Sequence, residues 1–236
     1  MTAALSYELQ DGIATLTMDD GKANALGVSM LAAINEALDR AQSEKAAVVI
    51  IAGRDKMFSG GFDLAAFKRS PTEVVEMLGA GALLAQRLLA FPVPVVAACT
   101  GHAVAMGSFL LMSCDARIGP ETDAKFHVNE VAIGMILPFF AIEVCRQRLT
   151  PAHLTQVAIL ATPMNGQQAL AAGVLDEVVA PDAVRARARE RAMALKALVP
   201  GAHTATKLRV RQPALAAMKA AIAQDTIDWA AAFRTA

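Results

Sequence analysis

The sequence predicts an α/β fold with a largely parallel sheet. Two continuous apolar runs rich in β-branched residues, 47–52 and 93–99, are typical of strands that are buried on both faces. Helical periodicity over 28–42 and 72–89 alternates with these runs. Alternating strands and helices require crossover connections, and such connections place successive strands parallel to one another.

Local signals define the other elements of the first hundred residues. Strands over 6–10 and 13–18 flank an Asp-Gly dipeptide at 11–12, which is a strong hairpin signal. The Ser-Pro-Thr sequence at 70–72 supplies the residues that commonly begin a helix, so the second helix is expected over 72–89.

The second half of the chain is predicted to be mainly helical. We expect a small-residue turn over 101–107, a short buried helix over 108–113, and strands over 116–118 and 124–126. From residue 138 onward the pattern is almost wholly helical. Helix breaks are expected near Pro151, Pro163, Gly173, Pro181, Pro200 and Pro213.

Composition limits the classes of partner. The 236 residues are 55% apolar, and 22 basic residues balance 22 acidic ones, so we expect neither a nucleic-acid partner nor a membrane partner. The three cysteines lie in apolar runs and indicate reduced core thiols. No Cys/His pair has zinc-like spacing, so no metal site is expected. Without a signal-peptide pattern or a membrane-length apolar run, the expected location is cytoplasmic.

Two glycine-containing turns, at 58–64 and 101–108, stand between a buried strand and a helix. Glycine allows positive φ angles and close approach of a ligand, and helix N-termini carry unpaired N–H groups. If the two turns converge, they can hold an oxygen atom that becomes negative during a reaction. By itself, such a turn is more often only a connection.

Several blocks resemble one known family in their order and spacing. They are Asn24-Ala25-Leu26, Phe58-Ser59-Gly60-Gly61-Phe62-Asp63-Leu64, Pro92-Val93-Pro94-Val95, Cys114-Asp115-Ala116-Arg117-Ile118, Asn129-Glu130-Val131 and Ala172-Gly173-Val174-Leu175. With these blocks the chain resembles the crotonase (enoyl-CoA hydratase/isomerase) family. The resemblance implies a ClpP/crotonase-like spiral of ββα units over 1–180 and a C-terminal helical oligomerisation region over 181–236. It also implies a homotrimer or hexamer.

The resemblance also implies a substrate and a site. The substrate is an acyl-CoA thioester, whose carbonyl is polarised by the main-chain N–H groups of Phe62 and Met106 while Glu130 acts as the base. Coenzyme A is part of the substrate, so no separate cofactor is implied. The resemblance implies six CoA-binding residues: Lys22, Ala23, Ala25, Gly60, Asp63 and Leu64. The sequence itself favours Asp63 as a helix cap or an anchor for its turn.

The side chain at position 109 distinguishes between reactions. Glu130 lies among apolar residues, and desolvation of a carboxyl group raises its pKa, which makes it a better base near neutral pH. The alternative is that Glu130 is a solvent-exposed carboxylate on a loop. Hydratases of the family generally use a second glutamate, whose position falls here on Phe109. A single base suffices to move a double bond, so the resemblance favours an enoyl-CoA isomerase. Hydration, thioester hydrolysis and non-catalytic acyl-CoA binding remain alternatives.

Overall fold

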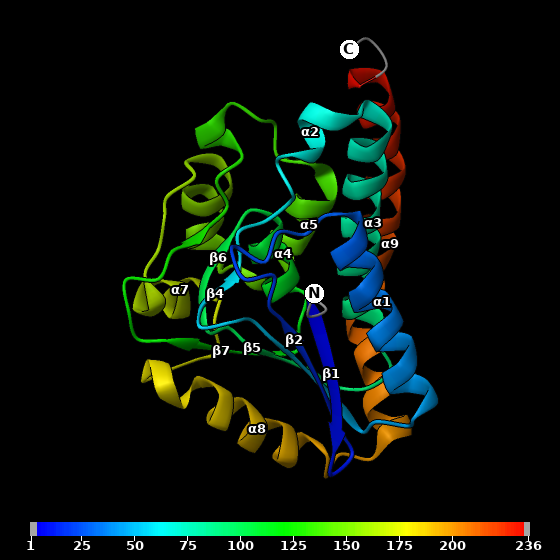
Figure 1. Ribbon diagram of the computed structural model, residues 1–236, viewed down its shortest axis with the longest axis vertical. Coiled ribbons are helices and arrows are strands. Elements are labelled where there is room, and N and C mark those ends of the chain that lie inside the picture. The colour runs from blue at the N-terminus through cyan, green and yellow to red at the C-terminus, as the bar shows by residue number, and fades with distance from the viewer. Residues whose placement is uncertain (1–3, 234–236) are drawn as a thin grey trace.

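A computed structural model describes residues 4–233, and its main sheet has six strands (Figure 1). In spatial order these are β1 (Leu5–Gln10), β2 (Ile13–Met18), β3 (Val48–Ala52), β5 (Val95–Ala98), β7 (Ala116–Pro120) and β9 (Glu177–Val179). The β1–β2 hairpin is antiparallel, and every later pairing is parallel. The predicted α/β class and the largely parallel sheet are confirmed.

A second, smaller sheet corrects two predictions. It consists of β4 (Lys56–Ser59), β6 (Gly101–Val104) and β8 (Phe126–His127), all parallel. The expected turn over 101–107 therefore begins as a strand, β4 was not predicted, and the strand expected over 124–126 lies at β8. These strands have two to four residues and depend on non-local pairing, so their sequences carry little periodicity.

Helices cover both faces of the main sheet (Figure 1). The helices are α1 (Val28–Ser43), α2 (Ala66–Arg69), α3 (Pro71–Ala90), α4 (Met106–Met112), α5 (Phe139–Arg148), α6 (Pro151–Leu154), α7 (Gly166–Ala172), α8 (Val184–Leu195) and α9 (Pro200–Ala232), with single turns at Val131–Ile133, Thr155–Ile159 and Pro181–Ala183. In β3, Val48 and Ile50 belong to the apolar cluster under α8, whereas Val49 and Ile51 belong to the larger core on the opposite face. This alternation follows from the two-residue period of a strand.

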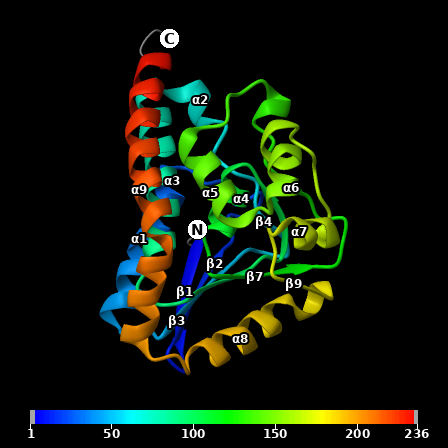
Figure 2. The same ribbon diagram turned by 180° about the vertical axis from the view of Figure 1, so that it is seen from behind.

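The C-terminal half departs from its prediction at two places. Strand β9 interrupts the region expected to be almost wholly helical, and α9 continues through Pro213, where a break was expected. Helix α9 packs against both α3 and α5 (Figure 2), so tertiary contacts hold both halves of α9 although the proline lacks an N–H group. The oligomerisation role expected for 181–236 stays a prediction.

None of the helices within residues 4–233 combines the length and hydrophobicity that a bilayer crossing requires.

Candidate active site

The two glycine-containing turns abut, as expected of a shared site. Gly61 has φ of +97°, and a Cβ atom there would lie 2.8 Å from the Cβ of Ala105 and 3.4 Å from the main-chain nitrogen of Met106. A Cβ atom on Gly107 would collide with the carbonyl oxygen of Ser59. Because both positions lack a side chain, the end of β4 and the start of α4 can lie in direct contact.

Ala105 makes the sharp change of direction from β6 into α4. Its backbone angles are φ 49° and ψ −126°, a conformation that costs a non-glycine residue about 1–3 kcal/mol. Two hydrogen bonds hold the turn: Ala105 N–H donates to the His127 carbonyl at 2.8 Å, and Ser108 Oγ donates to the Ala103 carbonyl at 2.7 Å. Met106 is consequently the first residue of α4, and its N–H group has no partner within the helix.

The main-chain N–H groups of Phe62 and Met106 lie in these abutting turns. Within residues 4–233, neither N–H group has a hydrogen-bond acceptor. The side chains of both residues approach α3 at Gly81, where a Cβ atom would lie 2.6 Å from the Phe62 ring. Two unpaired amide groups in adjacent turns are suited to binding an oxygen that develops negative charge.

Glu130 lies between β8 and α5 and is only 6% exposed. Its Oε2 atom has no hydrogen-bond partner in the described part of the chain. Burial raises the pKa of this carboxyl group to about 7. The prediction that Glu130 is desolvated is therefore supported, and the surface-carboxylate alternative is wrong. A carboxyl group with such a pKa can both accept and return a proton near neutral pH.

Glu130 opens onto a narrow cleft, which we name the Glu130 cleft. Residues from both turns, from helices α2 to α5 and from the segment between β8 and α5 line it: Gly60, Phe62, Leu64, Phe67, Leu78, Ala105, Phe109, Asn129, Glu130, Ile133, Met135, Pro138 and Phe140. Glu130 is the single carboxylate in this lining. Phe109 occupies the position that the resemblance assigns to the second glutamate of hydratases. Its buried ring lies edge-on to that of Phe140, with ring centroids 5.8 Å apart.

The predicted CoA-binding residues lie mainly on two neighbouring segments. Gly60 N–H donates to the Ala23 carbonyl at 2.8 Å, which joins the loop before α1 to the cleft. Asp20 fixes this loop by accepting hydrogen bonds from the N–H groups of Lys22 and Ala25. Lys22 is exposed, and Leu64 lines the cleft mouth. These positions remain predictions as CoA contacts.

Asp63 anchors its own turn. Its carboxylate accepts a hydrogen bond from Ala65 N–H at 3.0 Å and pairs with Arg69 at 2.8 Å. Arg69 holds the pKa of this carboxyl group below its usual value. Both carboxylate oxygens therefore have partners within the protein, as expected of an anchor.

Asn24 and Ser59 belong to the quoted sequence blocks but had no predicted role, and they connect the parts of the site. Asn24 is fully buried, and its Nδ2 donates to the carbonyls of Met18 at 2.9 Å and Phe58 at 3.1 Å. Ser59 Oγ donates to the Asn24 carbonyl at 2.8 Å and accepts from Gly61 N–H at 3.1 Å. In the sequence, only the position of Ser59 directly before Gly60 and Gly61 could have indicated such a role.

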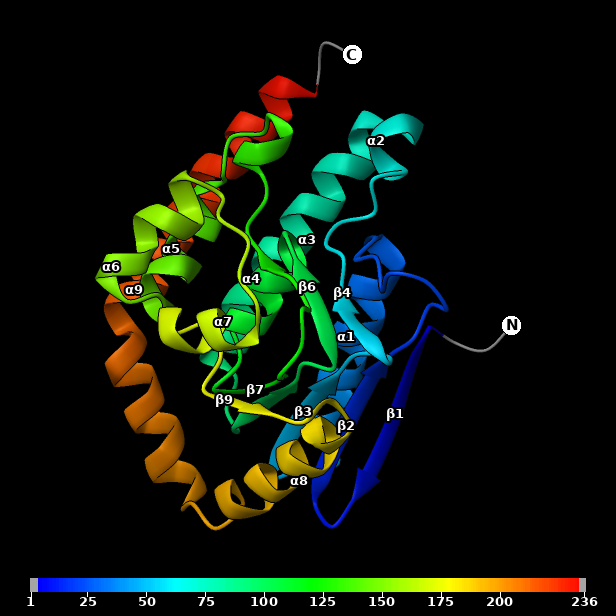
Figure 3. The ribbon, with the colours of Figure 1, turned by 90° about the vertical axis from the view of Figure 1, so that its left-hand side faces the viewer.

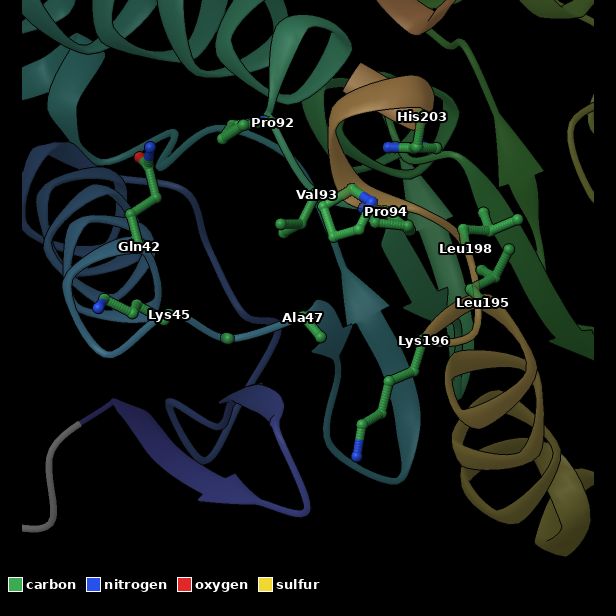
Figure 4. A pocket seen from close by; sticks show the side chains of 12 residues that line it. Gln42, Lys45, Ala47, Pro92, Val93, Pro94, Leu195, Lys196, Leu198 and His203 are labelled. Atoms are coloured by element: carbon green, nitrogen blue, oxygen red, sulfur yellow. The ribbon is translucent and has the colours of Figure 1, made fainter. Parts of the chain in front are cut away.

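A second cavity lies between α1, the start of β5 and the α8–α9 junction (Figure 4). Its described lining combines apolar residues such as Val93 and Leu198 with the side chains of Lys45, Lys196 and His203. That lining holds no carboxylate, and the cavity shares no residue with the Glu130 cleft. The chemistry that the sequence predicted therefore belongs to the Glu130 cleft.

Comparison with known proteins identifies the family. A family model described as enoyl-CoA hydratase/isomerase matches residues 8–235. A probable enoyl-CoA hydratase of Bacillus subtilis (strain 168) is 29% identical over 196 residues, which cover 82% of this chain and 75% of the relative.

Two similar solved structures are of one and the same Mycobacterium tuberculosis protein, whose two descriptions name different activities. One, described as an enoyl-CoA isomerase, superposes with a TM-score of 0.90 at 45% identity, covering 94% of this chain and 97% of the other. The other, described as a probable enoyl-CoA hydratase, superposes with a TM-score of 0.94 at 43% identity, covering 97% of each chain. The family predicted from the sequence blocks is confirmed: this chain belongs to the enoyl-CoA hydratase/isomerase family and has the crotonase fold.

Proposed function

We propose that the protein is an enoyl-CoA isomerase that converts 3-enoyl-CoA thioesters into 2-enoyl-CoA thioesters. The observation that carries this proposal is the presence in one cleft of a buried carboxylate, Glu130, whose Oε2 atom has no partner within residues 4–233, and an apolar ring at Phe109. Isomerisation needs one group that removes a proton and returns it. Hydration additionally needs a group that orients water.

In the proposed reaction the thioester oxygen accepts hydrogen bonds from the N–H groups of Phe62 and Met106. Glu130 removes a proton from C2, and the electron pair of that C–H bond moves toward the thioester oxygen to give a dienolate. The neutral Glu130 then returns the proton to C4, the C3–C4 double bond is lost, and the C2–C3 double bond forms. Each preorganised amide stabilises the negative oxygen by about 3–4 kcal/mol in comparable sites.

Burial of Glu130 supports its role as the base. A base is most effective when its pKa lies near the working pH, and burial raises the pKa of Glu130 to about 7. The apolar lining would also exclude water from the dienolate, which strengthens the two amide hydrogen bonds.

Hydration is the second candidate, and one observation favours it. Asn129 lines the same cleft, and its Oδ1 atom is buried without a partner within residues 4–233. Such an amide oxygen can accept a hydrogen bond from a water molecule and orient it toward C3. Glu130 would then take one proton from that water and deliver one to C2.

Separate incubations with 3-hexenoyl-CoA and with crotonyl-CoA distinguish the reactions by their products. We expect rapid formation of 2-hexenoyl-CoA from the first and little 3-hydroxybutyryl-CoA from the second. Dominant hydration that is lost in Asn129→Ala would instead support the second candidate. Release of free CoA would indicate thioester hydrolysis, and saturable binding without turnover would indicate a binding protein.

A further inference from the structure

One stripe of α9 contacts both sides of the Glu130 cleft. Asp225 and Trp229 of α9 and Phe233, which caps the end of α9, follow at intervals of four residues and therefore lie along one side of the helix. The end of α9 lies beside α5 (Figures 2 and 3), and a contact between the rings of Phe233 and Phe67 joins it to α2. We name these three residues the α9 stripe.

Asp225 fixes the start of α5. It is 3% exposed, and its two carboxylate oxygens accept hydrogen bonds from the N–H groups of Phe139 at 2.9 Å and Phe140 at 2.8 Å. Pro138, which precedes α5, has no side chain that could cap it. Asp225 therefore supplies the missing cap from a distant segment and sets the position of Phe140.

Trp229 lies behind the wall of the cleft. Its ring meets that of Phe140 edge-on with centroids 6.2 Å apart, and Phe140 meets Phe109 in the same way. Phe109 and Phe140 line the cleft and are at most 1% exposed, whereas Trp229 is not part of the lining. The three rings therefore pack in layers, and Trp229 prevents the Phe140 side chain from moving away from the cleft.

Phe233 makes the corresponding contact on the other side. Its ring meets that of Phe67 in α2 with centroids 6.0 Å apart, and Phe67 lines the cleft near its mouth. The α9 stripe consequently positions two lining rings, one from α2 and one from α5.

We propose that the α9 stripe determines which acyl groups the protein accepts, by closing the Glu130 cleft so that short acyl chains are bound in preference to long ones. This inference rests on the proposed function, because it assumes that the acyl group of a thioester occupies the cleft. Each methylene group that an apolar pocket accommodates or rejects changes discrimination by about tenfold or more. Trp229 is then a specificity-determining residue that acts through Phe140.

Binding tests this inference without requiring turnover. Trp229 is the only tryptophan of the chain, so its fluorescence reports on the wall directly. Titration with free CoA should leave the emission unchanged, whereas hexanoyl-CoA should alter it and bind about tenfold more tightly than hexadecanoyl-CoA. Equal or tighter binding of hexadecanoyl-CoA would overturn the proposal.

Kinetics with a chain-length series test the residue itself. In Trp229→Ala, Phe140 gains space, so the ratio of kcat/KM for 3-hexadecenoyl-CoA to that for 3-hexenoyl-CoA should rise about tenfold. Ile227→Ala, at a position 64% exposed on α9, should leave this ratio unchanged. If Trp229→Ala does not fold in a thermal-unfolding control, Trp229→Phe should give a smaller rise in the same direction.

The outcomes separate the two proposals. Chain-length-dependent binding without any isomerisation would reject the proposed function and retain the role of the α9 stripe. Isomerisation with an unchanged chain-length ratio in the folded Trp229 variant would retain the function and reject that role.

Discussion

Two regions of this protein hold a carboxylate in opposite ways: Glu130 is buried, and Asp115 is partly buried. In the Glu130 cleft, the Oε2 atom has no partner in the described part of the chain. Near the start of β7, Asp115 accepts from Val95 N–H at 2.8 Å and pairs with Lys207 at 2.7 Å and Arg211 at 2.9 Å. A carboxylate that is fully paired within the protein holds segments together, whereas a buried carboxyl oxygen without a partner is poised to exchange a proton.

The largest effect that would sharpen this comparison is the loss of activity in Glu130→Gln. Because glutamine cannot carry the proton, kcat for 3-hexenoyl-CoA isomerisation should fall about a hundredfold to ten-thousandfold. Hexanoyl-CoA binding should change little, and Glu76→Gln, at an exposed position on α3, is the matched control. Retained turnover would remove Glu130 from the mechanism.

Asp115→Ala should act on stability instead. Removing this carboxylate leaves the buried Lys207 and the partly buried Arg211 without their ion-pair partner, so the free energy of unfolding should fall by about 3–5 kcal/mol in urea denaturation. The folded fraction should keep its kcat. A stable variant that has lost its activity would contradict the distinction between the two regions.

The pH dependence of activity is the next effect in size. The base acts in its ionised form, and burial raises the pKa of Glu130 to about 7. Below that pH, kcat/KM should fall about tenfold per pH unit, and above it kcat/KM should level off. An inflection near the ordinary glutamate pKa would show that Glu130 is not desolvated when it reacts.

The smallest effect is the pH dependence of stability. Between the ordinary pKa of 4.5 and about 7, the folded protein holds the Glu130 proton more tightly than the unfolded chain does. The contribution of Glu130 to stability therefore falls as pH rises through this window, by roughly 1–3 kcal/mol. Wild type should lose this stability relative to Glu130→Gln between pH 5 and pH 8, as measured by chemical denaturation. A constant difference would be inconsistent with the raised pKa.

The sequence was sufficient for the features that depend on local patterns. Apolar runs predicted β3 and β5, and the Asp-Gly turn predicted the β1–β2 hairpin. The burial of Glu130 was expected only together with the family resemblance, because the local sequence also allowed an exposed loop carboxylate. The small sheet was missed because β4 and β6 pair with strands far away in the chain. Strand β6 also begins with Gly101, and glycine is uncommon in strands. No local pattern predicts that Asp225 caps α5, because Asp225 belongs to α9, which is distant from α5 in the sequence.

The position of the α9 stripe also affects how the protein is made. Asp225 lies 85 residues after Phe140 in the chain. At about 5–20 residues per second, a ribosome reaches Asp225 about 4–17 s after it has added Phe140. During that interval the nascent chain already contains Phe109, Glu130 and Phe140 but not the helix that backs them. The Glu130 cleft is therefore completed late in biosynthesis, and its apolar walls need protection from aggregation until α9 has emerged.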